Sequence, residues 1–355
     1  FYILLIHSTK VASMTLSTHS CVVKGKQQVE VISQRVTYQG EGTLVKISRG
    51  GICGSDLHYY QHGKVGNFAI KMPMILGHEV IGTVEKSDNS QFKPGQKVAI
   101  NPSKACGECQ YCLTEDTNQC LAMRFFGSAM MNPHVDGGFT QYKIVDTSQC
   151  VPFDASLDDR IMVFAEPLAV CLHAVNQAGG VADKRVFISG VGPIGCLLVA
   201  VAKASGAREI VCSDISPRAL TLADKLGASV PLLADDEMTA YRAQKGAFDV
   251  SFEASGHPSA LTRCIDVTRA RGCIVQVGMG GDIPQFPMMT VIAKELRIVG
   301  TFRFTHEFTT AVDWLASGKI NPLPLFSGEY SYREVDEALQ FAGDKQQASK
   351  VQLVF

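Results

Sequence analysis

Residues 185–207, RVFISGVGPIGCLLVAVAKASGA, predict a strand, a glycine-rich turn and a helix in immediate succession. RVFIS is a short, mostly apolar run of the length of a buried strand. Gly190, Gly192 and Gly195 follow at G-x-G-x-x-G spacing, and an apolar stretch of helical length comes after them. A second strand-like run, EIVCSD, ends at Asp214, 19 residues beyond Gly195. Together these features indicate a βαβ unit more strongly than the glycine spacing would alone.

The glycine-rich turn predicts a dinucleotide site. Gly190 permits a tight turn, Gly192 lets a pyrophosphate approach the backbone, and Gly195 lets the helix pack closely on the strand. The helix N-terminus supplies N–H groups and a positive dipole end. Asp214 would accept hydrogen bonds from the adenosine ribose and repel a 2′-phosphate, which favours NAD, whereas Arg218 keeps NADP open. The alternatives are a phosphate loop for another nucleotide and, for Asp214, a helix N-cap.

The predicted secondary-structure pattern changes near Phe164. From about Cys21 to Asp146, short strand-like runs broken by Gly, Pro and Asn predict an irregular β-rich region. After Phe164 a helical stretch leads into strands that alternate with helices, which predicts a parallel sheet. A helix at Glu307–Ala316 and a strand at Lys350–Phe355 leave that alternation and are expected to return to the first region. The fold class is therefore α/β in two domains, with boundaries expected at 14–165 plus 304–355 and at 166–303.

Composition limits the partners of the chain. It has 355 residues, 33 basic and 34 acidic side chains, and a formal net charge of -1, so it carries no field that would attract nucleic acid or an anionic membrane. No apolar run approaches a membrane span. We take Met14 as the natural start and residues 1–13 as a non-native extension, because FYILLI lacks the basic flank of a signal peptide. A cytoplasmic location and reduced cysteines are expected.

Four cysteines in CGECQYCLTEDTNQC, residues 106–120, predict a closed metal site. Cys106, Cys109, Cys112 and Cys120 have gaps that let four thiolates converge on one tetrahedral zinc ion. An iron–sulfur cluster is the main alternative, although the fourth cysteine lacks the following proline of bacterial ferredoxins. Disulfide pairing is the other alternative, and a reducing compartment disfavours it.

A second group of potential metal ligands differs in chemistry. Cys53, in GGICGSDLHYY, and His78 and Glu79, in GHEVIG, offer a thiolate, an imidazole and a carboxylate, which is the open type of set found at catalytic zinc. Glu166, in AEPLAV, could approach the same metal. Asp56 could orient His78 as a carboxylate partner, or it could simply cap a helix. The ordinary alternatives are a buried structural Cys53 and a solvated or salt-bridged Glu79.

These segments resemble the zinc-dependent medium-chain dehydrogenase family, in its sorbitol (polyol) dehydrogenase branch. The resemblance runs from about Met14 to Phe355 and includes GGICGSDLHYY, GHEVIG, the cysteine-rich lobe at 101–121, AEPLAV and SGVGPIG in family order. It implies a GroES-like catalytic domain and a Rossmann coenzyme domain. It also implies a catalytic zinc at Cys53, His78 and Glu79 with Glu166 near the fourth position, and a structural zinc at the lobe.

The resemblance further implies roles for single residues. Ser55 would take the proton of the substrate hydroxyl and pass it through the coenzyme ribose to His58. Tyr59, Glu166 and Arg303 would contact substrate, with Arg303 suited to a bidentate carboxylate contact. For Arg303, a surface arginine or a hydroxyl donor is the equal alternative. Further coenzyme contacts are assigned to Pro193, Ile194, Val277, Gly278 and Thr301.

Other positions carry weaker expectations. Arg124 is a further substrate candidate, while His134 and His306 are taken as surface residues without a role. Phe304 stands where polyol dehydrogenases often have Tyr, which would remove one hydroxyl from the pocket. The sequence turn SDNSQ, residues 87–91, lacks a glycine often found there.

The expected activity is reversible oxidation of a secondary alcohol by hydride transfer to NAD(P), with a sugar acid as substrate and a neutral polyol as the alternative. A non-catalytic binding protein would be expected to lack Cys53, Ser55, His78 or Glu79, and an iron–sulfur carrier would bind iron. A dimer or tetramer through the apolar stretch TVIAKELRIVG, residues 290–300, is compatible with this sequence.

Overall fold

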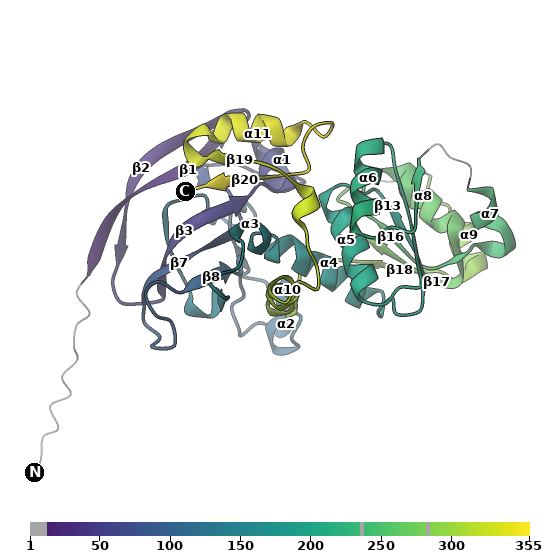
Figure 1. Cartoon of the computed structure of the whole chain (residues 1–355), viewed down its shortest axis with the longest axis horizontal. Helices are drawn as coiled ribbons and strands as arrows, with labels where there is room; N and C mark the ends of the chain where they lie inside the picture. The colour runs from purple at the N-terminus through teal and green to yellow at the C-terminus, as the bar shows by residue number, and fades with distance from the viewer. Residues whose placement is uncertain (1–12, 235–237, 282–284) are drawn as a thin grey trace, which may run out of the picture.

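The computed structural model of the chain describes residues 13–234, 238–281 and 285–355. The proposed non-native extension, apart from residue 13, therefore lies outside the described residues. Figure 1 shows a β-rich part and a helix-flanked parallel sheet at opposite ends of the molecule, with helix α4 (Ala165–Gln177) between them. Among the described residues, no helix is both long and apolar enough to cross a bilayer.

The β-rich part is built on a sheet in the order β12-β8-β7-β3-β20-β19, to which β11 adds by pairing with β3. The strands are β3 (Thr43–Gly51), β7 (Glu79–Ser87), β8 (Lys97–Ile100), β11 (Tyr142–Val145), β12 (Cys150–Pro152), β19 (Phe326–Ser331) and β20 (Lys350–Val354). A second sheet has the order β2-β1-β6, with β1 (Met14–Gly25), β2 (Gln28–Tyr38) and β6 (Met74–Ile75). Two small ribbons are β9 (Ser103–Lys104) with β10 (Arg124–Phe125), and β4 (Lys64–Val65) with β5 (Phe68–Ala69).

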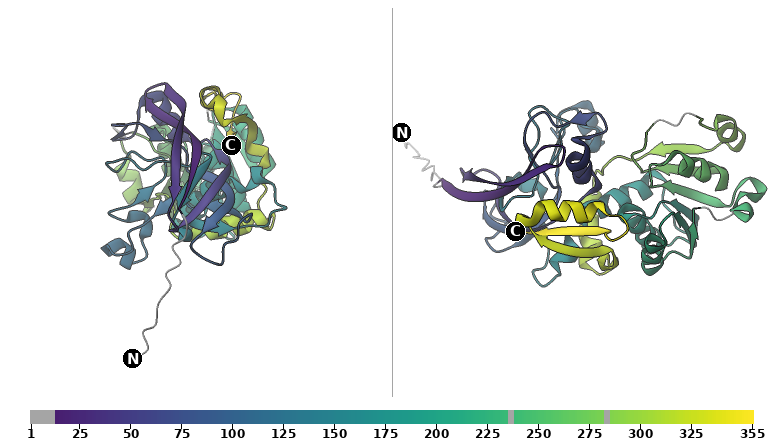
Figure 2. Two further views of the ribbon diagram at one scale, coloured as in Figure 1. Left: turned by 90° about the vertical axis from the view of Figure 1, so that its left-hand side faces the viewer. Right: turned by 90° about the horizontal axis from the view of Figure 1, so that it is seen from above.

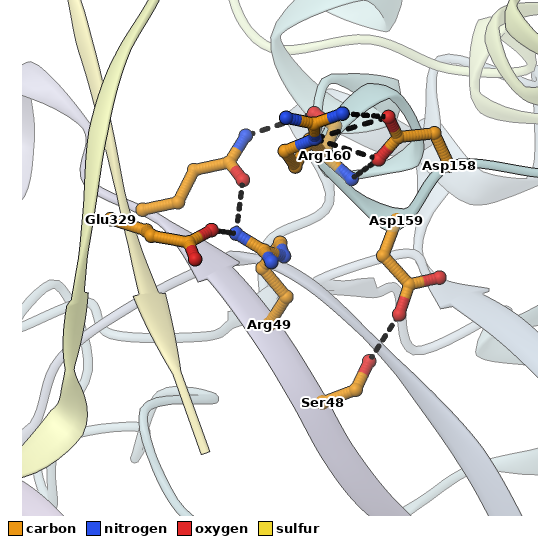
Figure 3. A network of polar contacts seen from close by, with 7 residues as sticks. Ser48, Arg49, Asp158, Asp159, Arg160 and Glu329 are labelled. Carbon is orange, nitrogen blue, oxygen red and sulfur yellow. Dashed lines mark hydrogen bonds and ion pairs between the residues drawn. The ribbon is translucent and has the colours of Figure 1, made fainter.

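The C-terminal strands belong to this first sheet, as Figure 2 shows by the yellow segments beside the purple ones. Polar contacts fasten them at its edge (Figure 3). Arg49 donates to Glu329 at 2.6 Å and to the amide oxygen of Gln352 at 3.1 Å. Gln352 in turn donates to the carbonyl oxygen of Arg160, whose guanidinium pairs with Asp158. The closing strand is therefore tied to both β3 and the segment before α4.

The parallel sheet has the order β15-β14-β13-β16-β17-β18, the doubly wound arrangement of a Rossmann fold. Its strands are β13 (Arg185–Ser189), β14 (Glu209–Asp214), β15 (Val230–Leu233), β16 (Phe248–Glu253), β17 (Thr268–Gln276) and β18 (Arg297–Gly300). Strand order reverses between β13 and β16, where ligands bind in such sheets. The sequence prediction missed β15, because this short edge strand contains Pro231, which argues against a strand in a sequence.

The helices cover these sheets and connect the two parts. They are α1 (Gly54–His62), α2 (Gln110–Leu113), α3 (Asp159–Met162), α4, α5 (Pro193–Ala204), α6 (Pro217–Leu226), α7 (Thr239–Arg242), α8 (Pro258–Val267), α9 (Met288–Lys294), α10 (Glu307–Ala316) and α11 (Val335–Gly343). Short 3₁₀ turns are η1 (Thr117–Gln119), η2 (Thr147–Gln149), η3 (Ala243–Lys245), η4 (Leu323–Leu325) and η5 (Tyr332–Glu334). One apolar core runs from Ile81 and Ala99 through α4 and α10 to the parallel sheet. The expected α/β fold class is thus confirmed.

Candidate active site and coenzyme site

The start of α1 and the start of β7 bring three potential metal ligands together. Cys53 immediately precedes α1, while His78 and Glu79 stand where β7 begins. Their ligand atoms all lie within 4.8 Å of one another. Gly77 makes the turn before His78 with φ +91°, and a Cβ there would overlap the ring of Phe139. The backbone therefore requires glycine at this point to aim the pair inward.

The donor set fits a bound cation. Burial, reinforced by the charge of Glu79, raises the pKa of the Cys53 thiol to about 12, so a thiolate here needs a positive partner. Nδ1 of His78 is buried and has no hydrogen-bond partner among the described residues. Buried polar atoms are rarely left unpaired, and thiolate, imidazole and carboxylate together are ligands that zinc takes at open sites.

Asp56 has the helix-capping role that was one of its two predicted alternatives, and it also supports the ligand group. It is fully buried, and its two oxygens accept from the amides of Cys53 and Gly77, each at 3.0 Å. Its distance to Nδ1 of His78 is 3.9 Å, which is too long for a hydrogen bond. The expected carboxylate–imidazole hydrogen bond is therefore absent here. Asp56 instead ties together the two segments that carry the ligands.

Lys350 is a site residue that sequence reasoning missed. It projects from β20 and donates to both carboxylate oxygens of Glu79 at 2.7 Å. Glu79 is thus salt-bridged, as one alternative held, yet it is 1% exposed rather than solvated. A carboxylate has lone pairs beyond those used here, so this pairing leaves it able to ligate a metal. The apolar surroundings of Lys350 in SKVQLVF offered no signal of this role.

Glu166 lies in the first turn of α4 and is 6% exposed. It is not among the three mutually close ligands. Burial raises its pKa to about 8; His78 opposes that shift, while the charges of Glu79 and Cys53 add to it. A carboxyl with this pKa can hold or release a proton near neutral pH, which suits acid–base work beside a metal.

Ser55 and His58 stand three residues apart on α1, on neighbouring positions of one helix face. Neither side chain has a hydrogen bond to another described residue. His58 is exposed, and its pKa is lowered by burial of part of the ring and by the nearby His62 and Lys345. Their predicted proton relay stays a prediction.

The guanidinium of Arg303 has a buried nitrogen without a hydrogen-bond partner among the described residues. This nitrogen is Nη1, and the guanidinium stacks 4.0 Å from the ring centre of Phe125 and 4.7 Å from that of Phe302. Burial lowers its pKa to about 10, opposed by the charges of Glu166 and Tyr59. Arg303 is therefore not the ordinary surface arginine that the alternative described. A half-buried guanidinium whose buried Nη1 lacks a partner is suited to an anionic ligand.

The other residues considered in the sequence analysis are buried in the core, hydrogen-bonded to the backbone or exposed at the surface. The hydroxyl oxygen of Tyr59 accepts from the amide of Ala129 at 2.9 Å, and its ring is 3% exposed. Phe304 is 2% exposed and stacks on Phe308 within the core. Its ring therefore does not line the substrate pocket, contrary to the expectation from the sequence. Arg124 is exposed on β10. His134 accepts from the amide of Lys71 at 2.8 Å, and His306 precedes α10.

The four lobe cysteines converge as the spacing predicts. Their sulfurs lie within 4.8 Å of one another, with 3.5 Å between Cys109 and Cys112. Amides of Leu121 and Cys112 donate to the sulfur of Cys109 and lower its pKa to about 6, whereas burial in the cluster raises that of Cys112 to about 12. Because metal ligation requires thiolates, a bound metal would displace the proton that Cys112 otherwise keeps. All twelve cysteines are free of disulfides.

The glycine-rich turn is buried at Gly190 and Gly195 and exposed at Gly192. Gly190 adopts φ +87°, and a Cβ there would meet Ser255 after β16 at 2.7 Å. A Cβ on Gly195 would collide with the carbonyl oxygen of Gly190, whereas one on Gly192 would meet nothing within 4 Å. Gly192 therefore borders the open space that a pyrophosphate would fill at the N-terminus of α5, which begins at Pro193 and Ile194.

Asp214 ends β14 and accepts from the amide of Val191 at 2.7 Å and that of Ser216 at 2.8 Å. The N-cap of α6 is Ser216, so the alternative N-cap role for Asp214 is wrong. Arg218 reaches across to Ser327 of β19 at 3.4 Å. Asp214 and Arg218, the two residues predicted to select the coenzyme, thus both form hydrogen bonds within the protein.

The remaining assigned coenzyme contacts lie at the ends of β17 and β18. The amides of Val277 and Gly278 both donate to the carbonyl oxygen of Glu253 at 2.8 Å, which fixes the turn beside the strand crossover. The Thr301 hydroxyl is buried without a partner among the described residues. Their contact with a coenzyme stays a prediction.

Comparison with known proteins agrees with this geometry. Residues 39–155 match the family described as alcohol dehydrogenase GroES-like domain, and residues 193–317 match that described as zinc-binding dehydrogenase. The chain is 63% identical over 343 residues to L-idonate 5-dehydrogenase (NAD(P)(+)) of Escherichia coli K12, covering 96% of this chain and 100% of that protein. It is 33% identical over 310 residues to sorbitol dehydrogenase of Bacillus subtilis, covering 84% and 86%.

A solved structure is similar over the same length. The crystal structure of L-idonate 5-dehydrogenase from Escherichia coli K-12 superposes with a TM-score of 0.96 at 62% identity, covering 97% of this chain and 100% of that one. The family resemblance and the two-part fold are thereby confirmed. Zinc rather than an iron–sulfur cluster is the metal of the matched family. The chain belongs to the zinc-dependent medium-chain alcohol dehydrogenase family, whose chemistry is NAD(P)-linked oxidoreduction.

Proposed function

We propose that this chain oxidises the C5 secondary alcohol of L-idonate reversibly to 5-ketogluconate, with NAD(P) as the hydride carrier. The observation that carries the proposal is the 63% identity, over the full length of the relative, to L-idonate 5-dehydrogenase. Segments such as CGSDLHYYQHGKVGNF, MRFFGSAMMNPHVDGGFTQY and GTFRFT resemble the same bacterial enzyme. The half-buried guanidinium of Arg303, whose Nη1 lacks a hydrogen-bond partner among the described residues, supports an acidic substrate.

The chain's own residues divide the work of this reaction. When bound, a zinc ion at Cys53, His78 and Glu79 supplies Lewis acidity toward a hydroxyl, and a nicotinamide supplies the hydride acceptor. Arg303 binds and orients the substrate carboxylate. During oxidation, Ser55 Oγ takes the hydroxyl proton and the exposed His58 imidazole delivers it to solvent. During reduction, the proton moves in the opposite direction.

Glu166 provides a second place for a proton in the same site. Its carboxyl lies at the boundary of the two parts and without a bound metal has a pKa of about 8, so in the metal-free protein it is mostly protonated at neutral pH. We assign it to the edge of the metal site, where it contacts substrate or ligates in place of water.

A neutral polyol is the second candidate substrate. It is supported by the 33% identity to sorbitol dehydrogenase of Bacillus subtilis. Sorbitol, L-iditol and xylitol lack the carboxylate that Arg303 would pair with, so they are expected to be turned over less efficiently than the sugar acid.

The first experiment follows NADH and NADPH oxidation by absorbance with 5-ketogluconate. Turnover that a zinc chelator abolishes and added zinc restores supports the proposal. A folded, zinc-loaded preparation that reduces ketoses such as fructose, the keto partner of sorbitol, but not 5-ketogluconate would replace it with the polyol assignment. The NADH to NADPH ratio weighs Asp214, which disfavours the 2′-phosphate, against Arg218, which favours it.

The organisation of the chain supports three further assignments within this proposal. Residues 14–165 and 304–355 form the catalytic domain, with its zinc lobe at 101–121, and residues 166–303 form the coenzyme domain.

Exposed Met288, Met289 and Ile292 beside the edge strand β18 support a homodimer or tetramer through that edge, which light scattering of an Ile292→Lys variant tests. Twelve free cysteines support a cytoplasmic location, which cell fractionation tests.

A further inference from the structure

The cysteine lobe and the strand β10 that follows it each contribute one side chain to the surroundings of Arg303. Asn118, in the turn η1 two residues before Cys120, donates from Nδ2 to the carbonyl oxygen of Phe302 at 2.8 Å. Phe125, on β10 after the lobe, lies beneath the guanidinium of Arg303 and 5.4 Å from the imidazole of His78, centre to centre. The ring of Phe125 thus lies between the metal-site histidine and the predicted carboxylate-binding arginine.

Asn118 and Phe125 are both buried and packed against neighbouring residues. Phe125 is 7% exposed and packs in an apolar cluster with Cys120 and Met123. Asn118 is 8% exposed, and its amide also lies 3.4 Å from Nε2 of His173. These contacts fix the lobe against α4 and against the segment that follows β18.

The backbone at Arg303 needs such support. Arg303 has φ +54°, a left-handed conformation that is unfavourable for a non-glycine residue and persists only where neighbours impose it. The carbonyl of Phe302 belongs to the peptide plane whose nitrogen begins Arg303, so the orientation of that plane determines this φ. Asn118 holds this plane through the carbonyl oxygen of Phe302, and two residues beyond Arg303 the amide of Thr305 donates to Glu307 at 2.8 Å.

We infer that Asn118 is a positioning residue for the substrate carboxylate, because it imposes the left-handed backbone that aims the Arg303 guanidinium over Phe125. The inference rests on the proposed function only for the identity of the anion. It assigns the metal lobe a part in substrate specificity as well as in stability.

Asn118→Ala removes the hydrogen bond, and Asn118→Asp keeps the shape of the side chain but removes the donor. One hydrogen bond of this kind corresponds to about a threefold to tenfold change in affinity. We expect both variants to raise the KM for 5-ketogluconate by that factor while the KM for NADH stays within about twofold of wild type. The matched control is Asn176→Ala, which removes an amide from the same polar network, donating to Glu307 at 2.9 Å, without touching Phe302.

A second readout does not depend on substrate. Phenylglyoxal modification of Arg303, followed by mass spectrometry of its peptide, should be about threefold faster or more in both Asn118 variants and unchanged in Asn176→Ala. If wild type fails to reduce 5-ketogluconate, the proposed function fails and the modification rates alone decide the inference. Unchanged modification rates, or equal effects of the Asn118 variants and Asn176→Ala, would overturn it.

Discussion

Lys350 and Glu79 form a buried ion pair between the closing strand of the chain and the start of β7. The ammonium donates to both carboxylate oxygens at 2.7 Å and also to the carbonyl oxygen of Ile52 at 3.2 Å. Burial opposes the charged form of Lys350, but the charges of Glu79 and Cys53 outweigh it and leave its pKa raised. The last strand therefore supplies the positive charge that pairs with Glu79 in the metal site, and it also extends the sheet.

Lys350→Met should destabilise the metal-free protein by about 3 kcal/mol, because it leaves the Glu79 carboxylate buried without a partner. Urea unfolding of metal-free and zinc-loaded samples measures this, and the loss should be smaller with zinc. The control is Lys64→Met at an exposed lysine, expected within about 0.5 kcal/mol of wild type. Equal stability of both variants would contradict a structural role for the pair.

Cys120→Ala should lower the metal content from two zinc ions per chain to one, because it removes one of the four converging sulfurs. Cys150→Ala is a matched control, since both side chains are 6% exposed and Cys150 lies on β12 away from the lobe. Elemental analysis by mass spectrometry gives the count. Loss of iron instead of zinc, or loss of metal in the control, would contradict the assignment.

Two glycine substitutions separate coenzyme binding from folding. Gly192→Ala should unfold within about 2 °C of wild type yet bind NADH more than tenfold more weakly, because its Cβ enters the space predicted for the pyrophosphate. Gly195→Ala should lose about 2 kcal/mol or more of stability, since its Cβ meets the backbone oxygen of Gly190. Thermal unfolding and fluorescence titration with NADH measure both. A Gly192→Ala protein with unchanged NADH affinity would refute the predicted site.

Arg303→Gln should raise the KM for 5-ketogluconate more than tenfold, because loss of a buried charge partner is costly for an ionic ligand. The KM for any neutral polyol that the enzyme accepts should change much less. Arg35→Gln, at an exposed arginine on β2, is the control and should leave both values within about twofold. Equal losses for acid and polyol would show that Arg303 serves as a general hydroxyl donor instead.

The pair of Glu307 and His173 predicts a pH dependence of stability. Burial alone would raise the pKa of Glu307, but hydrogen bonds from His173, Asn176 and the amide of Thr305 outweigh it and bring the pKa to about 2. A lowered pKa in the folded state contributes stability that is present above the ordinary value near 4.5 and is lost as pH falls toward 2. The stability difference between wild type and Glu307→Gln should therefore shrink as pH is lowered from about 5 to 2. A difference independent of pH in urea unfolding would count against this pairing.

Local patterns in the sequence were enough to predict most of the fold and the groups of potential ligands. The helix predicted at Glu307–Ala316 has those bounds in the structure, and RVFIS and EIVCSD coincide with β13 and β14. Short gaps let four cysteines converge, because a turn of a few residues suffices to aim them at one point. The strand β15 was missed because Pro231 hides it, and the role of Asp214 as an N-cap was wrong because Ser216 takes that position.

The sequence by itself determined the parallel-sheet unit, the glycine turn and the identities of the metal-ligand candidates, since each depends on residues close together in the chain. Only the tertiary structure decided that Lys350 pairs with Glu79, that Asp56 holds two backbone amides and that Arg303 stacks on Phe125. Lys350 and Glu79 are 271 residues apart, and Arg303 and Phe125 meet only when the lobe folds against the segment after β18. Contacts of this kind leave no local pattern, because they follow from how the whole chain packs.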